Sequence, residues 1–122
     1  MNHPLRFALN RMVAPRLSLA DFVALAVTLK ADAIEIRNDL KGIEIEDGTA
    51  PQTVRDLCAA QGIRVLSINA LYPFDVWNDQ RRAQALKLAA YARECGAEAV
   101  VLCPSNDRAD QRNEIGRASC RE

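Results

Sequence analysis

Two stretches of the chain share one arrangement: Cys58-Ala-Ala-Gln-Gly-Ile-Arg-Val65 and Ala92-Arg-Glu-Cys-Gly-Ala-Glu-Ala-Val100. Each has the pattern of a helix end, a glycine, and the start of an apolar strand. Gly62 and Gly96 suit the left-handed backbone conformation in which many helices stop. A repeated helix–glycine–strand junction is typical of proteins built from successive βα units.

Four short apolar runs alternate with helical stretches at intervals of about thirty residues, the spacing of βα repeats. Each run is aliphatic or β-branched and is bounded by residues that favour turns, as expected of strands buried on both faces of a parallel sheet. The predicted strands are residues 6–10, 33–37, 64–69 and 99–103.

Helix signals fill the gaps between these strands. Ser18 and Asn78 are predicted N-caps, and Thr49-Ala-Pro-Gln52 is predicted to form a capping box with proline in the first turn. The residues predicted to face the core are Phe22, Val23, Ala26 and Leu29 in the first helix, Val54, Leu57 and Cys58 in the second, and Ala83, Leu86, Ala89 and Ala90 in the third.

A parallel βα repeat closes as a TIM barrel or remains an open doubly wound sheet. No glycine-rich phosphate loop follows the first predicted strand, which disfavours the dinucleotide-binding open sheet. A barrel needs roughly 250 residues, and this chain has 122. We therefore predict an α/β fold, the N-terminal half of a (β/α)8 TIM barrel with about three and a half βα units, in residues 1–113.

The end of the chain has a different character. Residues 104–122 are polar, with Ile115 as their one large apolar residue, and residues 114–122 match one reading frame of a common short-read sequencing adapter. We interpret residues 114–122 as a non-native tail and the chain as a truncated reading frame. The alternative interpretation is an ordinary disordered C-terminus.

Composition excludes several classes of protein. Sixteen basic residues balance sixteen acidic ones, so no net charge attracts nucleic acid or an acidic membrane surface. The sequence contains no long apolar run and no signal-peptide pattern at its N-terminus, from which we expect a cytoplasmic protein without a membrane partner. The four cysteines include no CxxC pair, so we predict neither a disulfide framework nor a zinc site.

Polar side chains stand at the carboxyl ends of three predicted strands, where TIM-barrel enzymes place their working residues. Asn10 and Asn69 end the first and third strands, and Glu35 and Arg37 share one face of the second. We predict that all four face a substrate. The alternatives are a self-satisfied Glu35–Arg37 ion pair, which is costly to bury, and asparagines that serve only the turns.

The loop after the third predicted strand, Leu71-Tyr-Pro-Phe-Asp-Val-Trp77, holds three of the six aromatic residues. Such aromatics, including Trp77, can wall a sugar pocket and exclude water. They can equally cover a neighbouring loop with no ligand present. The sequence shows no nucleophile elbow, no P-loop and no Asp/Glu/His cluster with metal-ligand spacing, so we predict no catalytic residue and no metal ligand in it.

Three segments resemble the xylose-isomerase-like TIM barrels, the sugar-phosphate isomerase/epimerase group, and within it most of all inosose (2-keto-myo-inositol) isomerases of inositol catabolism. They are Ala33-Ile-Glu-Ile-Arg37, Leu66-Ser-Ile-Asn-Ala-Leu71, and Glu94-Cys-Gly-Ala-Glu-Ala-Val-Val-Leu-Cys-Pro104. The resemblance covers about residues 6–107 and implies a metal-dependent isomerisation or epimerisation of a sugar or inosose through an enediol.

The resemblance also implies a divalent ion, manganese, cobalt or zinc, held by a Glu, an Asp, a His and a second Glu from later strands beyond Asn113. We therefore expect the chain alone to hold no metal, to be inactive, and to self-associate through its exposed strand edges and apolar inner face. By position, Glu35, Arg37, Asn69 and the Trp77 loop correspond to the substrate-facing rim.

Two other functions are considered. One is an abasic-site endonuclease of the same superfamily, which the balanced charge disfavours because phosphate binding usually requires a basic patch. The other is a small non-enzymatic α/β binding module that is complete as it stands, with a native tail.

Overall fold

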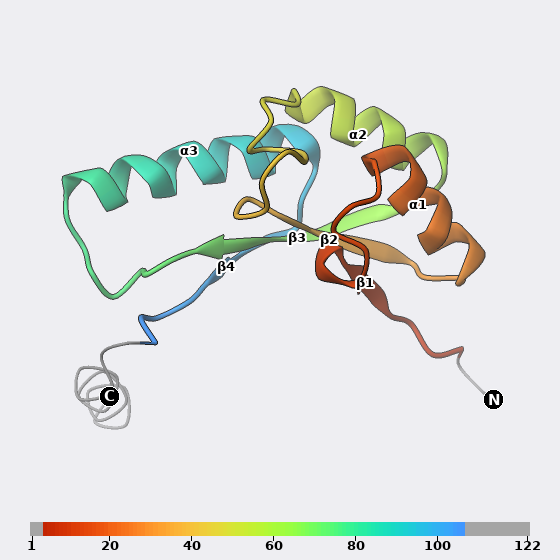
Figure 1. Ribbon diagram of the computed structural model, residues 1–122, viewed down its shortest axis with the longest axis horizontal. Coiled ribbons are helices and arrows are strands. Elements are labelled where there is room, and N and C mark those ends of the chain that lie inside the picture. Colours follow the sequence, from red (N-terminus) through yellow and green to blue (C-terminus); the bar gives the residue numbers. More distant parts are fainter. Residues whose placement is uncertain (1–3, 107–122) are drawn as a thin grey trace.

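The computed structural model describes residues 4–106, which form one parallel sheet and a layer of helices (Figure 1). The residues interpreted above as a non-native tail, 114–122, lie outside the described residues. The elements follow one another as β1 (Ala8–Asn10), the short 3-10 helix η1 (Arg11–Val13), α1 (Leu19–Thr28), β2 (Ala33–Arg37), α2 (Pro51–Ala60), β3 (Arg64–Leu71), α3 (Asp79–Cys95) and β4 (Ala99–Leu102).

The four strands are all parallel and lie in chain order, β1-β2-β3-β4. Within residues 4–106, α1, α2 and α3 all lie on the same face of this sheet, and the opposite face carries no α-helix (Figure 1). A doubly wound sheet would carry helices on both faces, whereas a barrel carries them only on its outside. The predicted α/β fold with barrel-type βα units is confirmed.

The core lies between the sheet and the helices because alternate strand residues point to opposite faces. Ile34 and Ile36 of β2 are fully buried under the helices, and Phe22 and Val23 of α1 cover them. The buried apolar residues of the core are Leu9, Phe22, Val23, Ala26, Ala31, Ile34, Ile36, Val54, Cys58, Ile63, Val65, Ile68, Leu71, Leu88, Ala92 and Cys95.

Local signals placed the ends of most helices correctly. Ser18 Oγ accepts a hydrogen bond from the Asp21 N–H at 3.1 Å, and Asn78 Oδ1 accepts one from the Arg81 N–H at 2.8 Å. Gly96 follows α3 with φ +81°, in the left-handed region that glycine adopts without strain. Both predicted side-chain caps and this glycine stop are confirmed.

The predicted capping box before α2 is wrong. The N-cap is Ala50, which provides no side-chain hydrogen bond, and Pro51 begins the helix. The Thr49 hydroxyl instead bonds to Asp47 Oδ1 at 2.5 Å, inside the preceding turn. A proline in the first turn removes one N–H that a cap would satisfy, which lessens the need for one.

The predicted buried face of α3 is also wrong. Leu86 is 58% exposed, whereas Leu88, Ala92 and Cys95 are buried at the i, i+4, i+7 positions of another stripe. This helix is rich in small apolar residues on all sides, so its sequence marks no unique face. In the first helix, Leu29 is likewise 47% exposed, because it follows the last helical residue.

No helix within residues 4–106 has the length and apolar character needed to cross a membrane.

Candidate functional site

Four polar side chains form a hydrogen-bonded row across the helix-free face of the sheet. Asn10 lies opposite Glu35 in the register of β1 and β2, and Glu35 lies opposite Ser67 in that of β2 and β3. Asn10 Nδ2 donates to Glu35 Oε2 at 3.1 Å, Ser67 Oγ donates to Glu35 Oε1 at 3.0 Å, and Asn69 Nδ2 donates to Ser67 Oγ at 3.0 Å. Three of the predicted site residues are therefore brought together.

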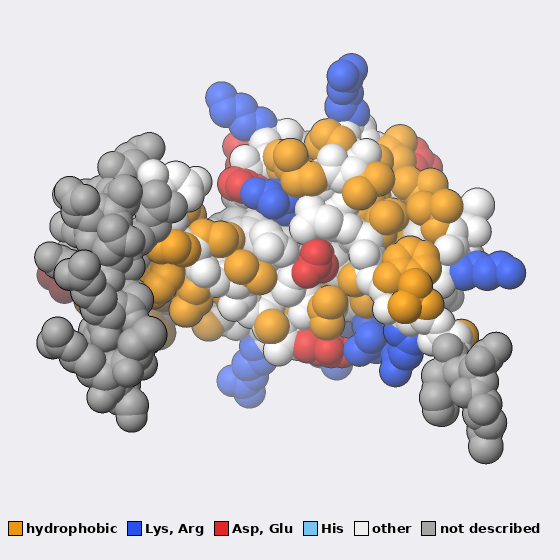
Figure 2. Space-filling view, turned by 90° about the horizontal axis from the view of Figure 1, so that it is seen from below, with side chains coloured by type: hydrophobic (Ala, Val, Ile, Leu, Met, Phe, Trp, Pro, Cys, Tyr) orange, Lys and Arg blue, Asp and Glu red, His pale blue; other side chains and the backbone are white. Residues whose placement is uncertain are grey.

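Ser67 is the member of this row that sequence reasoning missed. A register shift between Ile34 and Glu35 leaves one extra residue in β3 and sets Ser67 beside Glu35. A bulge of this kind is decided by strand pairing, so the sequence of β3 alone offers no signal for it. Figure 2 shows the helix-free face, where apolar side chains gather in patches with an acidic group near the middle.

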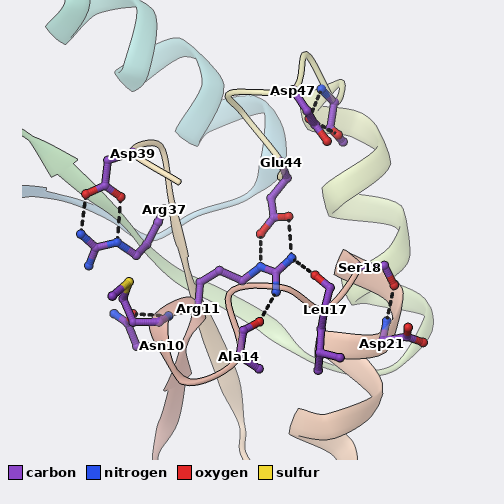
Figure 3. A network of polar contacts seen from close by, with 12 residues as sticks. Asn10, Arg11, Ala14, Leu17, Ser18, Asp21, Arg37, Asp39, Glu44 and Asp47 are labelled. Atoms are coloured by element: carbon purple, nitrogen blue, oxygen red, sulfur yellow. Dashed lines mark hydrogen bonds and ion pairs between the residues drawn. The ribbon is translucent and has the colours of Figure 1, made fainter. Parts of the chain in front are cut away.

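The alternative in which Glu35 and Arg37 satisfy each other is wrong. Glu35 bonds to Asn10 and Ser67, and within residues 4–106 it has no ion-pair partner. Arg37 pairs instead with Asp39, through Nε to Oδ1 at 2.8 Å and Nη2 to Oδ2 at 2.5 Å (Figure 3). The hydrogen bond from Arg37 holds the pKa of Asp39 below its usual value, and the same bond raises the pKa of Arg37.

A cavity of about 890 Å³ opens beside this pair at the carboxyl ends of β2, β3 and β4. Its volume lies within the range of small-molecule sites, roughly 300 to 1,000 Å³. Polar groups reach it from Arg37, Asp39, Lys87 and Tyr91, and apolar walls come from residues such as Leu71. The Tyr91 hydroxyl donates a hydrogen bond to the Thr49 carbonyl at 2.7 Å. Burial raises the pKa of this hydroxyl to about 12.

Of the aromatic residues in the loop after β3, only Tyr72 lines the cavity. Trp77 is 61% exposed and is not among the lining residues. The substrate-facing role predicted for Trp77 stays a prediction. Asp39, Lys87 and Tyr91 were not expected here, because their approach depends on the path of the loop between β2 and α2 and on which face α3 buries.

A second ion pair, also missed from the sequence, connects the segments that follow β1 and β2. Arg11 is fully buried and Glu44 is 2% exposed; Arg11 Nε donates to Glu44 Oε1 at 2.7 Å and Nη2 to Oε2 at 3.2 Å. The guanidinium also donates to the carbonyls of Ala14 and Leu17 (Figure 3). Its central carbon lies 4.8 Å from the ring centre of Phe22. This network joins the loop after β1 to the loop after β2.

The described residues do not fit a catalytic metal. Within residues 4–106 no three side chains of His, Cys, Asp or Glu come close enough to hold an ion. The row of Asn10, Glu35, Ser67 and Asn69 offers one carboxylate only, already bonded through both oxygens to neutral donors. This arrangement suits the binding of hydroxyl groups.

No protein-family model matches the chain, and no curated protein matches it. Among solved structures it is similar to a xylose isomerase domain containing protein from Salmonella typhimurium LT2, with a TM-score of 0.80 and 36% sequence identity. This match covers 88% of the chain and 40% of the Salmonella protein.

A second similar structure is a xylose isomerase-like TIM barrel/4-hydroxyphenylpyruvate dioxygenase fusion protein, with a TM-score of 0.64 and 20% identity. The match covers 79% of this chain and 16% of that one, and at this identity it bears on the fold alone. The chain thus spans less than half of either protein. Together with the one-sided parallel sheet, these likenesses show that the chain has the fold of part of a xylose isomerase-like TIM barrel.

Proposed function

We propose that this chain is part of a sugar or inosose isomerase or epimerase and that it provides one wall of the substrate site. The observation that carries the proposal is the row of Asn10, Glu35, Ser67 and Asn69 on the helix-free face of the sheet. In TIM barrels this face is the interior, and the carboxyl ends of its strands surround the active site.

The chemistry of the row supports a polyhydroxylated substrate. A carboxylate and two amides offer both acceptors and donors, and hydroxyl groups require both. The neighbouring Arg37–Asp39 pair adds a bidentate ion pair at the edge of the cavity. The likeness to a xylose isomerase domain containing protein favours a sugar over other polyols.

The task assigned to the described residues is to bind and orient this substrate. A metal-dependent reaction, with manganese, cobalt or zinc, requires ligands from outside residues 4–106, since those residues form no site for an ion. The family resemblance implies that these ligands lie on later strands beyond Asn113, so we expect the 122-residue chain to be inactive by itself. The inosose specificity rests on the sequence resemblance of β2 and β3 alone.

The test is hydrogen exchange at the carbon next to the substrate carbonyl, followed by NMR in D₂O with added Mn²⁺, Co²⁺ or Zn²⁺. Two proteins are compared: the 122-residue chain, and the product of the source reading frame read past the codon for Asn113. Exchange into a ketose, aldose or inosose by the longer product only is the expected result. Exchange by neither protein across the panel contradicts the isomerase proposal, and exchange by the shorter chain contradicts the assignment of binding alone.

A further inference from the structure

In the row of hydrogen bonds on the helix-free face, the donor and the acceptor of each bond can be assigned, starting from Asn10. The N–H of Met12 donates to Asn10 Oδ1 at 3.0 Å, and a backbone N–H can only donate. The oxygen of the Asn10 amide is thereby assigned, and its NH₂ group faces Glu35. Glu35 accepts this bond with Oε2.

The donors and acceptors between Glu35 and Asn69 can be assigned in the same way. An ionised carboxylate only accepts, so the Ser67 hydroxyl gives its single proton to Glu35 Oε1. Ser67 Oγ is left as an acceptor, and the neighbouring Asn69 must present its NH₂ group to it. The charge on Glu35 thus sets the orientation of an amide that it does not touch.

Asn69 Oδ1 then points away from Ser67. Within residues 4–106 no hydrogen bond reaches this oxygen, and it is not sealed from solvent. Asn69 is half-buried and lies on the same face as Glu35 and Ser67, opposite the side covered by helices. Asn69 Oδ1 is therefore a hydrogen-bond acceptor with a fixed orientation and no donor within residues 4–106.

We propose that Asn69 Oδ1 accepts a hydrogen bond from a substrate hydroxyl, and that Glu35 is a positioning residue that fixes this acceptor through Ser67. The inference rests on the proposed function and deepens it: the ligand must be a hydroxyl donor at this point. A keto oxygen or a fluorine, which cannot donate, is disfavoured there.

The variant Glu35→Gln makes the proposal testable because it exchanges the donor and acceptor roles at Ser67 and Asn69 and keeps a hydrogen-bonding side chain at every position of the row. Asn10 still donates, so the oxygen of the introduced amide must face Asn10 and its NH₂ group must face Ser67. Ser67 then accepts from position 35 and donates to Asn69, whose amide turns over. The group offered to the substrate changes from an acceptor to a donor.

The first measurement needs no ligand. In the 122-residue chain, solvent exchange of the Asn69 side-chain NH₂ is followed by ¹⁵N NMR, with Asn69→Asp to identify the signal. Glu35→Gln is expected to accelerate exchange several-fold, because the NH₂ loses Ser67 and faces the open side. Ser67→Ala is the matched control: it accelerates exchange by itself, and adding Glu35→Gln to it changes nothing more.

The second measurement uses D-xylose and its singly fluorinated analogues. The original chain is expected to prefer a hydroxyl to fluorine at one position by about fivefold to tenfold, the worth of one neutral hydrogen bond. Glu35→Gln is expected to abolish or invert this preference at that position only. Loss of structure would lower the affinity for all the probes alike.

Failure of the roles proposed for Glu35 and Asn69 can be distinguished from failure of the proposed function. Unchanged Asn69 exchange in Glu35→Gln, or an unchanged hydroxyl preference, contradicts the positioning role of Glu35 and leaves the proposed function standing. No binding of D-xylose or any analogue by the original chain contradicts the acceptor role of Asn69, even where the exchange result holds. A lost preference together with faster exchange supports the whole inference.

Discussion

Two arginines of this chain make the same bidentate contact with a carboxylate in opposite surroundings. Arg11 and Glu44 are 0% and 2% exposed, and the pair joins the segments that follow β1 and β2. Arg37 and Asp39 are 23% and 51% exposed, two residues apart, at the mouth of the cavity (Figure 3). One pair is closed off by protein on every side, and the other remains open to water.

The difference teaches that geometry alone does not decide what an ion pair contributes. A buried pair has already lost its hydration, so removing one partner leaves an uncompensated charge in a medium of low dielectric. An exposed pair exchanges its partner for water at little cost. Arg11–Glu44 therefore contributes mainly to the stability of the loops, whereas for the exposed Arg37–Asp39 pair we propose a role in ligand binding.

The largest expected effect comes from Glu44→Gln. This change leaves the buried Arg11 guanidinium without a counter-charge and is expected to lower the free energy of unfolding by about 3–5 kcal/mol, measured by urea denaturation. Asp39→Asn is the matched control at the exposed pair. An equal decrease in the free energy of unfolding for the two variants would contradict the difference between the buried and the exposed ion pair.

A smaller loss is expected from Arg11→Lys. Lysine keeps the positive charge opposite Glu44 but lacks the planar fork that also reaches the carbonyls of Ala14 and Leu17. We expect a loss of about 1–3 kcal/mol from the carbonyls left without donors, again by urea denaturation. Should Arg11→Lys match Glu44→Gln, the fork rather than the charge would be the main contribution.

Asp39→Asn is expected to lower stability by less than about 1 kcal/mol at pH 7, because half of the Asp39 side chain is in solvent. The pKa of Asp39 is lowered in the folded chain, so its contribution is present above the unfolded value of about 3.9 and is lost as the pH falls through the folded value. The difference between wild type and Asp39→Asn should therefore vanish in acid, and a difference that grows below pH 4 contradicts this sign.

The smallest effect is expected at Arg64, the first residue of β3, and Glu98, the residue before β4. They pair at 2.6 Å with both side chains 46% exposed. Glu98→Gln should change the free energy of unfolding by less than about 0.5 kcal/mol. A change above about 1 kcal/mol would show that exposure fails to rank the ion pairs of this chain.

Much of the fold could be predicted from the sequence because its signals are local. The four strands, the caps at Ser18 and Asn78 and the glycine stop at Gly96 depend on residues within a few positions of one another. The buried face of α3 could not be predicted from the sequence. The helix has alanines on all its sides, so its buried face is determined by how it packs on the rest of the fold.

The candidate site was predictable only in part for the same reason. Alternation along β2 placed Glu35 and Arg37 on one face, and strand ends placed Asn10 and Asn69 near them. The contact of Arg11 with Glu44 spans 33 residues and depends on the paths of two loops. Ser67 joined the row through a register shift that arises only when β2 and β3 pair.

We propose that Arg11–Glu44 stabilises the fold and that Arg37–Asp39 binds the ligand. The most direct test of this assignment is a ¹⁵N NMR titration of the chain with D-xylose that follows the Nε–H signals of the two arginines. The account predicts that the Arg37 signal moves with added sugar, while the Arg11 signal stays in place and exchanges slowly with solvent. Movement of Arg11 without Arg37, or of neither, would contradict the assignment of one pair to binding and the other to stability.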